Sequence, residues 1–199
     1  MFTTWNDSSG VRFRDIEHLS LEASGLAATN DLLIVIGNGR YDGARGTSDA
    51  LYADWSDAAA PIVWDNLANA TVQTVNGSQI SNIERLVLRT GTGDDEIRNT
   101  VFATNDEIAS GDGNDVIDAG AGSDRVDAGA GDDELRLTFA NAFEFSDWVY
   151  GGSGGDRLIV DATAGAGDVL WYAVTDTGAP LDGAGYNSTM TEVERMLAA

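Results

Sequence analysis

The chain contains no cysteine, only two prolines and a single histidine among its 199 residues. Without cysteine, disulfides contribute nothing to its stability. Basic side chains are also scarce, with 11 against 33 acidic ones, which gives a formal net charge of −22. Nucleic acids and anionic membrane surfaces would repel such a chain, so both are excluded as direct partners.

The chain also lacks the motifs of common catalytic sites. It has no His-Glu-x-x-His and no phosphate-binding loop. His18 occupies a place where related stretches of the chain have arginine, so we expect a solvated strand residue. Paired carboxylates can serve a glycosidase, but the aspartates here recur at a fixed period, whereas a catalytic pair is singular. We therefore expect a protein that is not an enzyme.

Long apolar runs are missing as well. No run approaches the roughly 20 residues of a membrane-spanning helix, and residues 1–7 lack the basic and apolar regions of a signal peptide. We expect no membrane insertion, and either an export signal elsewhere or a longer parent protein.

Glycine, by contrast, is abundant, with 24 residues, and much of it belongs to a nonapeptide repeat. Each copy has glycine at positions two and four, aspartate at position six and a large apolar residue at position eight. In all copies but the last, position one is Thr, Ser or Ala. The five copies begin at Thr90, Ser110, Ala119, Ala128 and Gly151.

This pattern predicts a cation site. Alternate glycines let the backbone adopt positive φ and turn its carbonyls inward, and an aspartate follows two residues after the last glycine. Carbonyl and carboxylate oxygens on flexible loops favour calcium over the stricter octahedron of magnesium.

The spacing also predicts the fold. One apolar side chain per nonapeptide cannot form a core alone, but stacked turn-and-strand units can bury it. If two nonapeptides make one coil, Asp115 and Asp133 lie on one edge and Asp106 and Asp124 on the other. The expected fold is all-β: a parallel β-roll or β-solenoid with calcium-binding glycine-rich turns and degenerate flanking coils.

The nonapeptides resemble the RTX, or hemolysin-type, calcium-binding repeat. The resemblance implies a parallel β-roll with Ca2+ between successive turns and export by a type I route. It implies carboxylate ligands at Asp95, Asp115, Asp124, Asp133 and Asp156, with Asp106 as a weaker ligand because its turn has no glycine. The implied turn glycines are Gly91, Gly93, Gly111, Gly113, Gly120, Gly122, Gly129, Gly131, Gly152 and Gly154. We expect the interval of 23 residues between Asp133 and Asp156 to break the row, leaving two to four well-formed sites.

The stretches before and after the nonapeptides are expected to continue the same solenoid with less glycine. We divide the chain into degenerate coils and strands (1–89), the calcium-binding roll (90–159, with an insertion at 137–150) and a C-terminal segment of strands or a cap (160–199), within one continuous domain. A stretch at 48–55 is separated by about 35 residues from the Ile-Glu-Arg stretch near residue 84. Asp31 and Asp49 are expected to share one edge as turns without metal. Strands are expected at 32–36, 60–64 and 70–75, and a helix at 140–148.

Three functions fit this sequence. The first is a calcium-stabilised extracellular structural or interaction domain, on a cell or virion surface, of the adhesin or surface-layer type. The second is the secretion and folding module of an exported enzyme or toxin. The third is a glycan-binding accessory module, because five tryptophans are available to stack on sugars, although such residues also plug roll ends or pack in interfaces. The expected partners are calcium ions, further copies of the chain or a larger surface assembly, and possible glycans.

Overall fold

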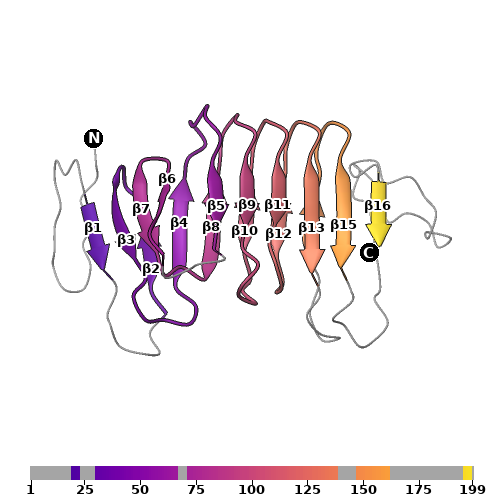
Figure 1. Ribbon diagram of the computed structural model, residues 1–199. Helices are drawn as coiled ribbons and strands as arrows, with labels where there is room; N and C mark the ends of the chain where they lie inside the picture. The colour runs from indigo at the N-terminus through magenta and orange to yellow at the C-terminus, as the bar shows by residue number, and fades with distance from the viewer. Residues whose placement is uncertain (1–18, 23–29, 67–70, 139–146, 162–194, 199) are drawn as a thin grey trace.

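The computed structural model describes residues 19–22, 30–66, 71–138, 147–161 and 195–198. The regular secondary structure in these ranges consists of β-strands alone. The strands form three sheets, and the chain winds between them as a stack of coils (Figure 1). The expected all-β parallel roll is confirmed. Within the described ranges, no helix is long and apolar enough to cross a membrane.

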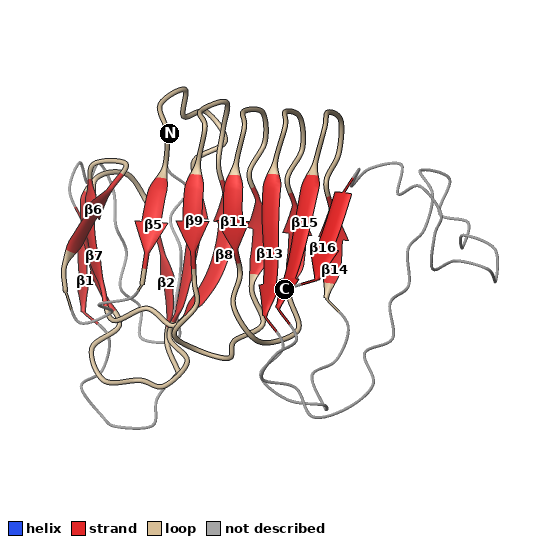
Figure 2. Cartoon of the chain, turned by 45° about the vertical axis from the view of Figure 1, so that its right-hand side comes forward, coloured by secondary structure: helices blue, strands red, loops and turns tan. Residues whose placement is uncertain are grey.

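Two parallel six-stranded sheets form the walls of the roll, with sheet C in front of sheet B in Figure 2. Sheet B consists, in spatial order, of β14 (Trp148–Tyr150), β12 (Arg125–Asp127), β10 (Glu107–Ala109), β8 (Arg85–Arg89), β4 (Ala50–Asp54) and β2 (Leu32–Ile34). Sheet C consists of β16 (Arg195–Ala198), β15 (Arg157–Asp161), β13 (Glu134–Thr138), β11 (Val116–Asp118), β9 (Glu96–Arg98) and β5 (Val63–Asp65). Both sheets run without interruption across residue 90.

The core lies between the two walls. Seven of the twelve described wall strands have three residues, so the alternation of side chains turns only the middle one inward. The position-eight residues of all five nonapeptides are buried, at most 7% exposed: Ile97, Ile117, Val126, Leu135 and Leu158. Burying each such side chain contributes about 1.5 to 3 kcal/mol, so the repeat supplies one core residue per turn.

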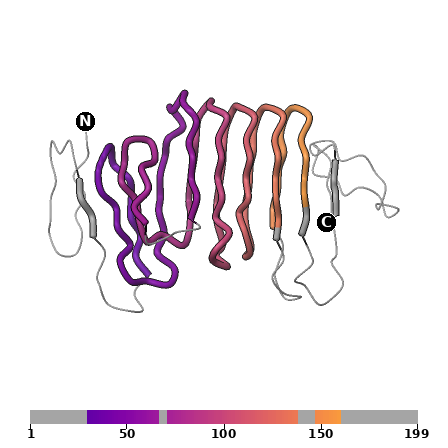
Figure 3. The backbone as a smooth tube through the Cα atoms, in the orientation of Figure 1, coloured from indigo at the N-terminus to yellow at the C-terminus, as the bar shows by residue number. Residues whose placement is uncertain are grey.

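The number of residues per coil varies along the stack. In Figure 3 the turns of successive coils nevertheless lie side by side in a row. β11 pairs with β13 at an offset of 18 residues, and β9 pairs with β11 at 20. β4 pairs with β8 at 35, since Ala50 lies opposite Arg85. The 35-residue spacing in the sequence is therefore one wide coil.

The wide coils extend into a third sheet, sheet A, at the N-terminal end of the stack (Figure 1). Its order is β1 (Leu19–Glu22), β3 (Gly39–Asp42), β7 (Ser78–Ser81) and β6 (Gln73–Val75). β6 and β7 are antiparallel, joined at Asn76 and Gly77, which have φ of 44° and 77°. Positive φ at both residues is typical of a type I′ hairpin turn, and this hairpin is the one departure from parallel pairing among the described strands.

Several local expectations differ from the structure. The strand expected at 32–36 is shorter in the structure, since β2 covers Leu32–Ile34, and its burial alternates: Leu32 is 62% exposed while Leu33 is buried. Trp148 begins β14 instead of ending a helix, and residues 140–146 of that predicted helix lie outside the described residues, as does His18. β13 extends to Thr138, so both ends of the insertion predicted at 137–150 are strands.

Candidate metal centre

Four of the five nonapeptides form turns on one edge of the roll, at the top of Figure 1. This first edge carries the chain from sheet B to sheet C through residues 90–95, 110–115, 128–133 and 151–156. The copy at 119–124 lies on the opposite, second edge, where the chain returns to sheet B. Backbone bridges join neighbouring first-edge turns, and Ala130 pairs with both Asp112 and Ser153. The four similar turns therefore form one continuous row.

Glycine is required in these turns by both conformation and space. Gly113 and Gly131 have φ of 129° and 144°, which residues with a Cβ rarely adopt. A Cβ added to Gly131 would lie 1.8 Å from the carbonyl oxygen of Gly113. All ten glycines named above would place a Cβ within 2.6 Å of a backbone atom of the neighbouring turn. The turns therefore stack backbone to backbone.

The position-six aspartates of the first edge form an aspartate ladder. Oδ1 of Asp115 accepts from Asp95 N at 2.8 Å, Oδ1 of Asp133 accepts from Asp115 N at 2.8 Å, and Oδ1 of Asp156 accepts from Asp133 N at 3.1 Å. At the N-terminal end, Ile62 N donates to Asp95 Oδ1 at 2.7 Å. The predicted break between Asp133 and Asp156 is therefore wrong, because the interval of 23 residues leaves the stacking of the turns intact.

In three aspartates of this ladder, the second carboxylate oxygen lacks a hydrogen-bond donor. Oδ2 is buried without such a partner in Asp95, Asp115 and Asp133. The nearby hydroxyls of Thr90 and Ser110 donate instead to the carbonyls of Ser110 and Ala128, both at 2.8 Å, and a hydroxyl has only one proton. A buried carboxylate oxygen without a donor is costly unless a cation meets it. The first edge therefore fits a hard cation with oxygen ligands.

Burial raises the pKa of these carboxyls above their ordinary value. It raises the pKa of Asp95 and Asp115, and the pKa of Asp133 to about 6, where the neighbouring carboxylates Asp115 and Asp156 add to the effect. On the second edge, burial raises the pKa of Asp106 to about 7. Without a cation, the folded roll holds these protons more tightly than the unfolded chain does.

This difference predicts opposite pH responses with and without calcium. The ordinary pKa of aspartate is about 3.9, so the calcium-free roll loses stability as the pH rises from about 4 through about 6, the folded pKa of Asp133. In calcium, protons compete for the same oxygens, so affinity falls as the pH drops below about 6. Thermal unfolding at about pH 4.5 and pH 7.5, in chelator and in calcium, measures both slopes. Parallel slopes in the two conditions would contradict the prediction.

A second row of side chains, at position five, was missed by the sequence reasoning. Asp94 Oδ1 accepts from Asn114 N, Asn114 Oδ1 from Asp132 N, and Asp132 Oδ1 from Gly155 N, each at 2.8 Å. On the second edge, Asn105 Oδ1 accepts from Ser123 N at 3.0 Å. Short Asp and Asn side chains suit this capping of a turn amide, and their recurrence at position five was the available signal.

The second edge carries its own carboxylate row. Asp124 Oδ1 accepts from Asp106 N, and Asp147 Oδ1 accepts from Asp124 N, both at 2.8 Å. The first contact confirms that Asp106 and Asp124 share an edge. Asp147 was not a candidate, because the residues before it do not match the nonapeptide.

Toward the N-terminus, the second-edge carboxylate of Asp49 receives hydrogen bonds from the protein's own backbone. Asp49 Oδ1 accepts from Asp31 N at 2.8 Å, and its Oδ2 accepts from Gly46 N at 3.0 Å. Asp49 N in turn donates to Glu84 Oε2 at 2.8 Å. Asp31 and Asp49 thus share an edge, as their 18-residue separation predicts, and both oxygens of Asp49 already receive backbone N–H groups. These contacts favour the expected turn without metal.

No three His, Cys, Asp or Glu side chains converge on one point within the described residues. The first edge instead presents one buried carboxylate per coil beside the carbonyls of the stacked turns. Such an arrangement defines a cation-binding parallel β-roll.

Comparison with known families identifies the repeat. The model of the RTX calcium-binding nonapeptide repeat matches four copies, over residues 102–135 and 144–165. The chain therefore carries RTX repeats, which bind Ca2+. The first-edge turn at 90–95 lies outside the match, and the structure adds it to the row through Asp95. No curated protein and no solved structure matches the chain significantly.

Proposed function

We propose that this calcium-binding β-roll is a non-catalytic, calcium-stabilised structural or interaction domain that works outside the cell, on a cell or virion surface. The observation that carries the proposal is the row of buried first-edge oxygens without donors, in Asp95, Asp115 and Asp133. Such a row is a folding element that depends on its ion.

The electrostatics of the row support this dependence. Two carboxylates about 4 Å apart repel by about 4 kcal/mol at an effective dielectric near 20, and the chain carries a net charge of −22. Calcium removes this repulsion, so folding and binding are linked, as in other metal sites that the unfolded chain lacks. Extracellular calcium modules bind at about 10⁻⁴ to 10⁻³ M, which restricts the fully folded, calcium-loaded state to calcium-rich surroundings.

Exposed apolar side chains support a role in contact with other molecules. Trp148 and Tyr150 are 68% and 47% exposed on β14, whereas Trp55 and Trp64 are buried. The exposed indole of Trp148 can pack in self-association or stack on a sugar. A secretion and folding module remains the alternative, and a catalytic domain in the same gene would favour it.

A calcium titration followed by circular dichroism and size-exclusion chromatography tests the proposal. We expect a less compact chain with less β structure in chelator and a compact β-rich one in calcium, with a midpoint at about 10⁻⁴ to 10⁻³ M. A midpoint below about 10⁻⁶ M would contradict the extracellular assignment, because a cell interior would also load the sites. Light scattering and a glycan array on the loaded protein then separate self-association from sugar binding.

A further inference from the structure

The turn that leads to Asp106 differs from the first-edge turns in how its carboxylate is satisfied. It begins with Asn99 and reaches Asp106 in eight residues, whereas the turn 110–115 has six. Asn99 follows β9 directly, so it occupies the place that Thr90 and Ser110 occupy in the first-edge turns. Its side chain is longer than theirs and fully buried.

The Asn99 amide bridges the two oxygen types expected at a calcium site. Asn99 Nδ2 donates to the carbonyl oxygen of Glu84 at 2.8 Å and to Oδ2 of Asp106 at 2.7 Å. Asn66 Nδ2 donates to Asn99 Oδ1 and fixes the orientation of the amide. In Asp115, the corresponding Oδ2 is buried without a hydrogen-bond donor. The Asn99 amide therefore donates to Asp106 Oδ2, whereas the equivalent oxygen of Asp115 on the first edge receives no hydrogen bond.

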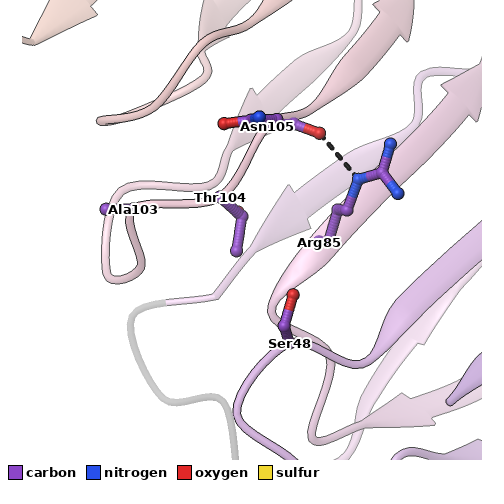
Figure 4. Close-up of a pocket in the computed structure, with 5 residues that line it drawn as sticks. All are labelled: Ser48, Arg85, Ala103, Thr104 and Asn105. Carbon is purple, nitrogen blue, oxygen red and sulfur yellow. Dashed lines mark hydrogen bonds between the residues drawn. The ribbon is translucent and has the colours of Figure 1, made fainter. Parts of the chain in front are cut away.

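Other groups complete the set around Asp106. Leu86 N donates to Asp106 Oδ1 at 2.8 Å, and the hydroxyl of Thr104 lies 3.2 Å from the same oxygen. Arg85 lies beside the turn, and its Nε donates to the carbonyl of Asn105 at 2.7 Å. Figure 4 shows Arg85 reaching Asn105 across a hollow lined also by Thr104 and Ser48. The turn thus has donors for both carboxylate oxygens and a cation nearby.

We infer that the Asn99 side-chain amide takes the place of a calcium ion at the Asp106 turn. Asp106 is then a structural residue and not a calcium ligand. The second-edge turn that joins β9 to β10 closes without calcium and forms the base on which the calcium-dependent coils stack. This inference rests on the calcium-binding role of the first edge.

The test replaces Asn99 by aspartate in the full chain. Asn99→Asp puts a second carboxylate against Asp106, so we expect a lower melting temperature in chelator, by about 2 to 4 °C for a change of about 1 kcal/mol. Calcium should restore the loss, and the variant should bind one ion more than the wild type by equilibrium dialysis. Asn105→Asp is the matched control, because it adds the same charge to the same turn at an exposed amide whose oxygen caps Ser123. It should gain no ion.

Hydrogen exchange of the wild type in chelator gives a second measurement that needs no variant. We expect the amide of Leu86, which donates to Asp106, to exchange at least about tenfold more slowly than those of Asp95 and Asp115, which donate to first-edge carboxylates. Equal exchange in these segments, or no extra ion in Asn99→Asp, would overturn the inference. A wild type that binds no calcium would instead overturn the role of the first edge.

Discussion

Gly131→Ala is expected to destabilise the calcium-loaded roll by about 3 kcal/mol or more. Gly131 has φ of 144°, a conformation that costs a residue with a Cβ about 1 to 3 kcal/mol. The added Cβ would also lie 1.8 Å from the carbonyl oxygen of Gly113 and 2.6 Å from its carbonyl carbon. Backbone atoms cannot move aside as the end of a side chain can, so the two turns must separate. The measurement is unfolding by denaturant in saturating calcium.

Gly155→Ala is the matched control in the same row. Gly155 has no positive φ, and its added Cβ would meet only the side chain of Asp132, at 3.2 Å. We expect a change within about 0.5 kcal/mol, as for ordinary surface substitutions. Equal losses in both variants would mean that any Cβ on this edge is harmful and that the close stacking at Gly131 has no special weight.

The regular part of the roll follows from the sequence because one period determines two structural features. In the nonapeptide from Ser110, the carboxylate of Asp115 faces the preceding turn, where it accepts from Asp95 N, and Ile117 faces the core. A shift of one residue would turn Ile117 outward, and in the copies from Thr90, Ala119 and Ala128 it would bury a charged neighbour of the position-eight residue. The register is therefore strongly specified. The stacking of Asp115 on Asp133 and the burial of Ile117 could therefore be predicted together.

The tolerance of the roll to longer coils could not be predicted in the same way. The five additional residues of the last coil fall between β13 and β14, on the second edge alone. Both β12 with β14 and β13 with β15 consequently pair at an offset of 23, and the turn 151–156 keeps its six residues. The spacing of the repeats in the sequence gives the length of the insertion but not the edge of the roll on which it lies. That edge decides whether Asp156 stays in the row.

The hydrogen bonds of the Asn99 amide could not be predicted from the repeat pattern either. Its partners, Glu84 and Asn66, are 15 and 33 residues away, and they meet it only because a coil of unusual length brings them together. Likewise, the antiparallel β6–β7 hairpin depends on the widening of one coil into sheet A. A repeat predicts what recurs, whereas these contacts occur once and depend on tertiary packing.

Asp115→Asn is expected to change the stability of the roll in opposite directions with and without calcium. Asparagine keeps the size of the side chain and the Oδ1 that accepts from Asp95 N, but it removes the charge from a buried position. In chelator the variant should be more stable than the wild type, because burial and the neighbouring carboxylates Asp95 and Asp94 disfavour the Asp115 charge, as its raised pKa indicates. In calcium the variant should be less stable, since the ion loses a charged ligand.

The opposite signs of the stability change in chelator and in calcium make the Asp115 prediction specific. We expect at least one ion fewer, or binding at least about tenfold weaker, which corresponds to about 1.4 kcal/mol. Asp127→Asn removes the same charge from an exposed position on β12 and should leave the calcium affinity nearly unchanged. Calorimetric titration and melting curves in both conditions give the comparison. A variant that is less stable in chelator as well would show that the Asp115 carboxylate supports the turn by hydrogen bonding alone, and that its charge is not held for a cation.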